Sequence, residues 1–201
     1  MVTLFSYVVA RDYGFAPNPF YGVCTLATCK PEIRRRAQIS DWIVGTGSRS
    51  YDLEGRLVFF MQVADVLSFD QYWDDPRFFR KRPELHGSIK QAFGDNIYHR
   101  NKNTGRWVQE DSHHSLSNGR INTANVKHDT QVDRVLIGID FAYWGEAGPK
   151  VPKRFRRDSA DLCKSGPGHK CHFRERFVDR FLEWVQSVSD RGFLGKPSEF
   201  R

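Results

Sequence analysis

The loop at residues 11–20 gathers side chains that could bind a nucleobase. Two prolines stiffen its backbone, and its candidate contact residues are Asp12, Tyr13, Phe15, Asn18 and Phe20. Aromatic rings can stack on a base, and an asparagine amide can both donate to and accept from a base edge. The alternative is that these aromatic side chains fold back and cap the core.

A second candidate for ligand contact is the segment Gly-Thr-Gly-Ser at residues 45–48. It lacks the pattern of a P-loop, but glycines allow close backbone approach to a ligand, and Thr46 and Ser48 supply hydroxyl groups. A plain turn is the equal alternative.

The densest group of acid/base side chains lies at residues 111–115. His113 or His114 could act as a general base, and candidates to assist them are Asp111, Asp95 and Tyr98. Because neighbouring residues of a strand point to opposite faces, we expect the two histidines not to share one site. A hydrogen-bonded structural histidine is the alternative to catalysis.

The charge balance favours a polyanionic partner. The chain has 31 Lys and Arg against 24 Asp and Glu, and residues 150–180 alone carry ten basic and four acidic residues. A localised basic surplus is typical of nucleic-acid binding, although a solvated surface would also explain it. The candidate phosphate contacts are Lys153, Arg154, Arg156, Arg157, His169 and Lys170.

Four cysteines, Cys24, Cys29, Cys163 and Cys171, are candidate zinc ligands only if their two pairs meet in space, because neither spacing is a compact knuckle. No signal peptide is recognised, so we expect a cytoplasmic protein with free thiols and no bound metal. No cofactor motif is present, and no cofactor is predicted.

Periodicity predicts the elements that would position these residues. Strands are expected at residues 3–9, 41–46, 56–66 and 134–144, a short helix at 31–37, and a hairpin at 95–110. Ser68 and Gln71 form a capping box for another short helix, and residues 174–189 form an amphipathic helix. The predicted class is α+β with a mixed or barrel-like sheet. No apolar run approaches the ~20 residues that span a bilayer.

Two stretches, at residues 41–48 and 55–63, resemble the core of PUA-like domains of the EVE and ASCH kind. The segment 74–76, Asp-Asp-Pro, fits a further element of that pattern, whereas Ser40 stands where those domains usually have glycine. The resemblance implies a small, partly closed barrel whose cleft accepts an extruded or modified base. Its walls would be residues 12–20 and 46–48.

The whole chain also resembles the second type of nucleotide modification associated domain, a bacterial and phage family. The similar stretches are residues 7–20, 94–99 and 111–115. That resemblance implies an association with systems that modify DNA bases. Partners would be nucleic acid, DNA before RNA, and other proteins of such a system, without a membrane.

We therefore expect one PUA-like domain over residues 1–201, with residues 145–201 packed on it as a basic loop and a terminal helix. The predicted function is recognition of a modified DNA base. Two alternatives stay open: an enzyme that acts on a nucleobase or nucleotide through His113 or His114, and a protein–protein adaptor that uses the terminal helix.

Overall fold

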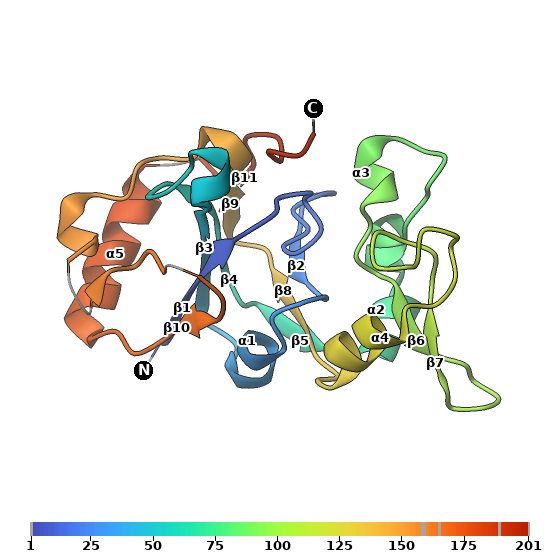
Figure 1. Ribbon diagram of the computed structural model, residues 1–201. Helices are drawn as coiled ribbons and strands as arrows, with labels where there is room; N and C mark the ends of the chain where they lie inside the picture. The colour runs from blue at the N-terminus through green and yellow to red at the C-terminus, as the bar shows by residue number, and fades with distance from the viewer. Residues whose placement is uncertain (1, 158–159, 165, 189, 201) are drawn as a thin grey trace. The chain divides into compact units, whose positions relative to one another are not determined.

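Six strands form a mixed sheet in the order β10-β1-β3-β4-β9-β11 (Figure 1). The computed structural model describes residues 2–157, 160–164, 166–188 and 190–200. The long strands β1 (Leu4–Val9) and β3 (Trp42–Gly47) are parallel, and β4 (Leu57–Gln62) runs antiparallel to β3. The shorter strands complete the sheet at both sides: β9 (Phe141–Tyr143), β10 (His169–Lys170) and β11 (Gly192–Phe193).

Helix α5 (Glu175–Ser187) covers this sheet, as its amphipathic sequence predicts. Its residues Val178, Phe181 and Val185 are buried in one cluster with sheet residues such as Val44 and Phe60. Ser189, the last residue predicted for this helix, lies outside the described residues. An adaptor that docks through Phe181 and Val185 would need these side chains at the surface, but both are fully buried.

A second group of elements contains two small sheets. Strands β2 (Cys24–Leu26), β8 (Val135–Gly138) and β5 (Asp65–Leu67) pair in that order, and β6 (Tyr98–Arg100) pairs with β7 (Trp107–Gln109) as the predicted hairpin. The accompanying helices are α1 (Pro31–Arg36), α2 (Phe69–Asp74), α3 (Ile89–Ala92) and α4 (Thr123–Thr130). The capping box of α2 forms as predicted between Ser68 and Gln71.

The elements group into two compact units. Unit 1 comprises residues 1–13, 37–64 and 138–201, and unit 2 comprises residues 14–36 and 65–137. Residues 145–201 therefore belong to unit 1 and include, besides α5 and β11, three-residue 3₁₀ turns at η3 (Gly145–Ala147) and η4 (Lys153–Phe155). Two other 3₁₀ segments in the described residues are η1 (Arg49–Tyr51) and η2 (Pro76–Lys81).

Two predicted strands were wrong in extent. The run at residues 56–66 divides into β4 and β5, and the run at 134–144 divides into β8 and β9. Both breaks fall where the chain passes between units, so the two halves of each run pair with different sheets. Ile139 is 70% exposed in the turn between β8 and β9.

The mixed α+β class is confirmed, but the expected barrel is not found. In the described part of the chain the sheets do not close into a barrel, since the two outer strands of the six-stranded sheet are β10 and β11. No described helix combines the length and the apolar character that crossing a membrane requires.

Candidate functional site

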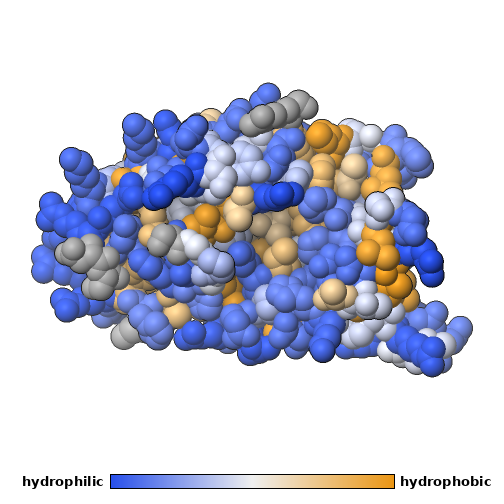
Figure 2. All heavy atoms as spheres, viewed as in Figure 1, coloured by the Kyte–Doolittle hydropathy of each residue, from blue (hydrophilic) through white to orange (hydrophobic). Residues whose placement is uncertain are grey.

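Unit 1 contains a basic groove, defined by ten residues from η4, α5 and the segments beside them. Its volume is about 540 Å³, and it is lined by Arg154, Phe155, Arg157, Ala160, His172, Phe173, Arg174, Arg176, Phe177 and Arg180. Hydrophilic residues gather over α5 and the segment before it, at the left of Figure 2. This concentration of guanidinium groups makes the groove a candidate anion-binding site.

The aromatic residues form the floor of the basic groove. The rings of Phe173 and Phe177 stack with centroids 5.0 Å apart and planes 9° apart, and Phe155 meets Phe177 edge to face at 5.6 Å. Phe155 is buried in the core of unit 1, whereas Phe173 and Phe177 are only partly buried. Arg176 and Arg180 are four residues apart, so the helical period places both on the exposed side of α5, next to this floor.

The arginines of the groove are exposed. Arg154 lies over the ring of Phe155 at 4.9 Å. Within the described ranges no carboxylate lies within ion-pair distance of Arg154, Arg157, Arg174, Arg176 or Arg180. An acidic side chain, Glu183, lines an adjoining hollow together with Arg154 and Arg180. The groove therefore offers several cationic donors to an incoming anion.

Of the residues predicted to bind phosphate, Arg154 and Arg157 line the groove. Lys153 is exposed beside them in η4. The other three have contacts elsewhere: Arg156 lies 3.9 Å from Asp161, Lys170 donates to the Asp161 carbonyl at 2.6 Å, and His169 packs on Phe5. The sequence prediction omitted Arg174, Arg176 and Arg180. Two of them, Arg176 and Arg180, could have been recognised because they lie on the polar face of the predicted terminal helix.

The predicted base-binding residues divide between the two units. In unit 1, the carboxylate of Asp12 is buried and accepts hydrogen bonds from the Tyr143 hydroxyl and the Ser198 amide. Thr46 is buried and donates to the Tyr7 carbonyl at 3.3 Å, and Ser48 Oγ accepts from the Ser50 amide as the cap of η1. Tyr13 is half-buried.

In unit 2, the three remaining base-binding candidates are buried. Asn18 donates to the Phe93 carbonyl at 2.9 Å and accepts from the ammonium of the buried Lys81 at 2.8 Å. Phe20 is 2% exposed, and Phe15 is 4% exposed. These contacts agree with the alternative in which the aromatic residues of the loop cap the core.

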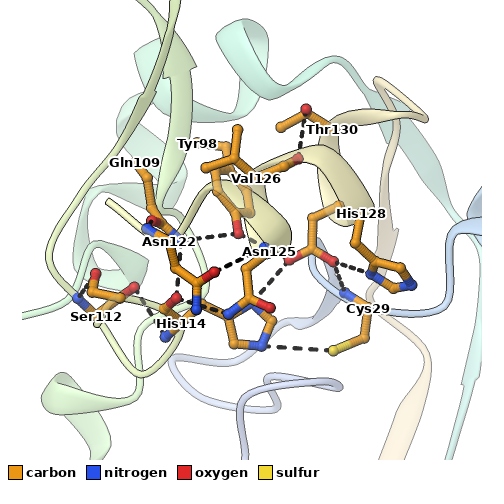
Figure 3. Close-up of polar contacts among 12 residues, drawn as sticks. Cys29, Tyr98, Gln109, Ser112, His114, Asn122, Asn125, Val126, His128 and Thr130 are labelled. Atoms are coloured by element: carbon orange, nitrogen blue, oxygen red, sulfur yellow. Dashed lines mark hydrogen bonds and ion pairs between the residues drawn. The ribbon is translucent and has the colours of Figure 1, made fainter. Parts of the chain in front are cut away.

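The two adjacent histidines lie together, contrary to the strand argument. Residues 111–115 form a turn rather than a strand, so side-chain alternation does not apply. The rings of His113 and His114 are 6.0 Å apart, and both contact Phe15, at 5.3 and 4.6 Å. Two amides hold the His114 carbonyl: Asn125 donates at 2.8 Å and Gln109 at 3.1 Å (Figure 3).

His114 forms a hydrogen-bonded chain with a carboxylate and a thiol, which we name the Cys29–His114–Asp129 cluster. His114 Nδ1 lies 2.9 Å from Asp129 Oδ2, and His114 Nε2 lies 3.8 Å from Cys29 Sγ (Figure 3). Burial acts to lower the pKa of His114, but the hydrogen bonds to Asp129 and Cys29 outweigh it and raise the pKa to about 9. Burial likewise acts to raise the pKa of Asp129, yet hydrogen bonds led by that of His114 hold it below its ordinary value.

Sequence reasoning missed the partners of His114. Tyr98, a predicted assisting residue, does reach the cluster, because its hydroxyl donates to Asp129 Oδ2 at 3.0 Å. Asp95 belongs to a different buried network in unit 2, where it accepts from Thr25 and Tyr72. Asp111 is exposed. Cys29 had been considered only as a possible zinc ligand.

The four thiols are free and are divided between the units. Cys24 and Cys29 lie in unit 2, and Cys163 and Cys171 lie in unit 1. Burial raises the pKa of Cys24 to about 12 and that of Cys163 to about 11. Among the described residues, no group of three His, Cys, Asp or Glu side chains is arranged to hold a metal ion.

The chain matches a known protein family. The family model of nucleotide modification associated domain 2 matches residues 1–201, the whole chain. No curated protein matches significantly. No solved structure does so either.

Proposed function

Because the chain belongs to the nucleotide modification associated domain 2 family, we propose that it binds nucleic acid, DNA in the first place, within a base-modification system. The binding surface is the basic groove of unit 1. The observation that carries the proposal is the set of five exposed arginines around a floor of stacked phenylalanines. A guanidinium group can donate two parallel hydrogen bonds to the oxygens of one phosphate, and unpaired bases stack on aromatic rings.

The two parts of the groove would contribute different kinds of binding energy. Arginine–phosphate contacts release counterions, so affinity falls with salt by a logarithmic slope of about 0.9 per phosphate for duplex DNA and about 0.7 for single strands. Stacking of a base on Phe173 or Phe177 would add ~1–3 kcal/mol and depend little on salt. A single strand, or a duplex with an extruded base, is therefore the expected ligand.

Recognition of a modified base is the finer part of the proposal. Extruding a base costs a few kcal/mol, and least where the base is mismatched or damaged. Stacking in the groove is of the same magnitude, so a modification that weakens pairing would favour binding. That Tyr13 and Ser48 also contact the base stays a prediction.

The test is a fluorescence-anisotropy titration with labelled single- and double-stranded oligonucleotides, with and without modified bases. We expect the double variant Arg154→Gln, Arg180→Gln to bind more weakly. Between about 50 and 200 mM salt, the slope of log affinity against log salt concentration should decrease in magnitude by up to about 2. Arg49→Gln is the matched control, because Arg49 is an exposed arginine of unit 1 that pairs with Glu54. An unchanged slope in the double variant would contradict the proposal, and so would absence of binding by the wild type.

A further inference from the structure

The Cys29–His114–Asp129 cluster has the order of groups that activates a thiol. The imidazole stands between a half-buried thiol and a fully buried carboxylate, with one ring nitrogen facing each. In enzymes with nucleophilic thiols, the base lies within reach of the sulfur and a third group orients the base. The distance of 3.8 Å from Cys29 Sγ to His114 Nε2 is within hydrogen-bond range for sulfur.

The backbone around Cys29 is held by the same residues. The Cys29 amide donates to Asp129 Oδ1 at 2.8 Å, and the fully buried Arg34 donates to the Cys29 carbonyl at 2.9 Å. Arg34 also donates to the Asp129 carbonyl. Cys29 and Lys30 both have positive φ, 55° and 41°, a conformation that is uncommon for residues other than glycine. These bonds keep the thiol in place although its backbone conformation is unfavourable.

The charged groups around the cluster come from several elements. Asp129 is also contacted by the His128 imidazole at 3.1 Å and by the Tyr98 hydroxyl. The Lys30 ammonium and the Arg34 guanidinium both interact electrostatically with Cys29. Negative charge that develops on or beside the sulfur would therefore meet three cationic groups: His114, Lys30 and Arg34.

We propose that Cys29 is a catalytic nucleophile that works as a pair with His114, and that its substrate is an acyl group on an ester, thioester or amide. Asp129 and Arg34 are positioning residues. An acyl substrate fits for two reasons. Its leaving group can take the proton of His114, and the nearby cations would stabilise the negatively charged oxygen that forms when the sulfur attacks the carbonyl carbon. This proposal does not rest on the basic groove, which lies in the other unit.

The proposed reaction needs no reagent other than the acyl substrate and water. The Cys29 sulfur forms a bond to the carbonyl carbon, and the carbonyl π electrons move to oxygen. As they return, the bond to the leaving group breaks, and the leaving group takes the Nε2 proton of His114. Neutral His114 then removes a proton from water while the hydroxide attacks the thioester. The sulfur leaves as the thiolate, so the pair is restored and a carboxylic acid is released.

The first experiment treats the full chain with p-nitrophenyl acetate and measures both p-nitrophenolate release and the acetylated peptide by mass spectrometry. We expect a burst close to one equivalent, with the acetyl group on Cys29. The burst should disappear in Cys29→Ser and slow by roughly a hundredfold in His114→Gln. Cys171→Ser is the control, because Cys171 is another half-buried thiol, and it should retain the burst.

A second measurement keeps the proposal testable if a variant folds poorly. The titration of the His114 ring, followed by NMR, should move from about 9 towards its ordinary value of 6.5 in Asp129→Asn, together with slower acetylation. Acetylation of Cys29 no faster than that of Cys171, or an unchanged rate in a folded His114→Gln, would overturn the proposal. DNA binding should be unaffected in Cys29→Ser, so failure of either proposal is recognised separately.

Discussion

Replacing His114 by glutamine should remove a specific, pH-dependent part of the stability. Its pKa rises from 6.5 to about 9 on folding, and each unit corresponds to about 1.4 kcal/mol, so its contacts with Asp129 and Cys29 together contribute about 3 kcal/mol after the cost of burial. Because the folded-state pKa is the higher one, this contribution is complete below pH 6.5 and is lost as the pH rises towards 9. The low pKa of Asp129 reflects the same interaction from the other side and is not added to it.

The assay compares urea unfolding of the wild type and His114→Gln at about pH 6 and about pH 9.5. The difference in unfolding free energy between the two proteins should shrink by about 3 kcal/mol at the higher pH. His113→Gln is the matched control, since it removes the neighbouring imidazole and leaves the hydrogen bond between His114 and Asp129 in place. A difference that does not change with pH would refute the reasoning, as would an NMR titration of His114 near 6.5.

Two further substitutions test the packing of unit 1. Phe181→Ala should cost about 3–5 kcal/mol of unfolding free energy, because its fully buried ring packs on Phe155 and Trp184 at 5.6 and 5.8 Å. Gly148→Ala should cost about 1–3 kcal/mol or more, because a Cβ there would lie 1.6 Å from the backbone oxygen of Leu57, which cannot move independently of β4. Urea unfolding measures both, and a loss below about 1 kcal/mol in either would contradict the packing described.

Local patterns predicted individual elements well. The β-branched and aromatic residues of Leu4–Val9, the capping box at Ser68 and the spacing of Phe177, Phe181 and Val185 each depend on neighbours within a few residues. Such signals are present in the sequence whatever the tertiary structure is. They could not reveal that β4 and β5 belong to different sheets, because an apolar run has the same periodicity on both sides of Ala64.

The candidate site was only partly predictable for the same reason. His114 was recognised by its type, but its partners Asp129 and Cys29 are 15 and 85 residues away in sequence. Asp129 lies on α4, whose sequence Thr-Ala-Asn-Val-Lys-His-Asp-Thr is too polar to show an apolar stripe. Arg34, one of three consecutive arginines, reads as a surface charge, yet it is fully buried and donates to four backbone carbonyls.

The basic groove is where composition was most informative. The surplus of basic residues between 150 and 180 pointed to the segment that contains the groove, and two of its residues, Arg154 and Arg157, line that groove. Composition could not tell which side chains face one another. That depends on the helical period of α5 and on the stacking of Phe173 with Phe177.

Photocross-linking tests the central claim most directly. DNA that carries 5-iodouracil, which cross-links to nearby aromatic residues, would be bound to the full chain, irradiated, and mapped by peptide mass spectrometry. The proposed mode of binding predicts adducts on Phe173 or Phe177, and fewer adducts for the variant Arg154→Gln, Arg180→Gln at equal concentrations. If the protein is saturated with DNA and adducts are found only outside the basic groove, the proposed mode of binding is contradicted.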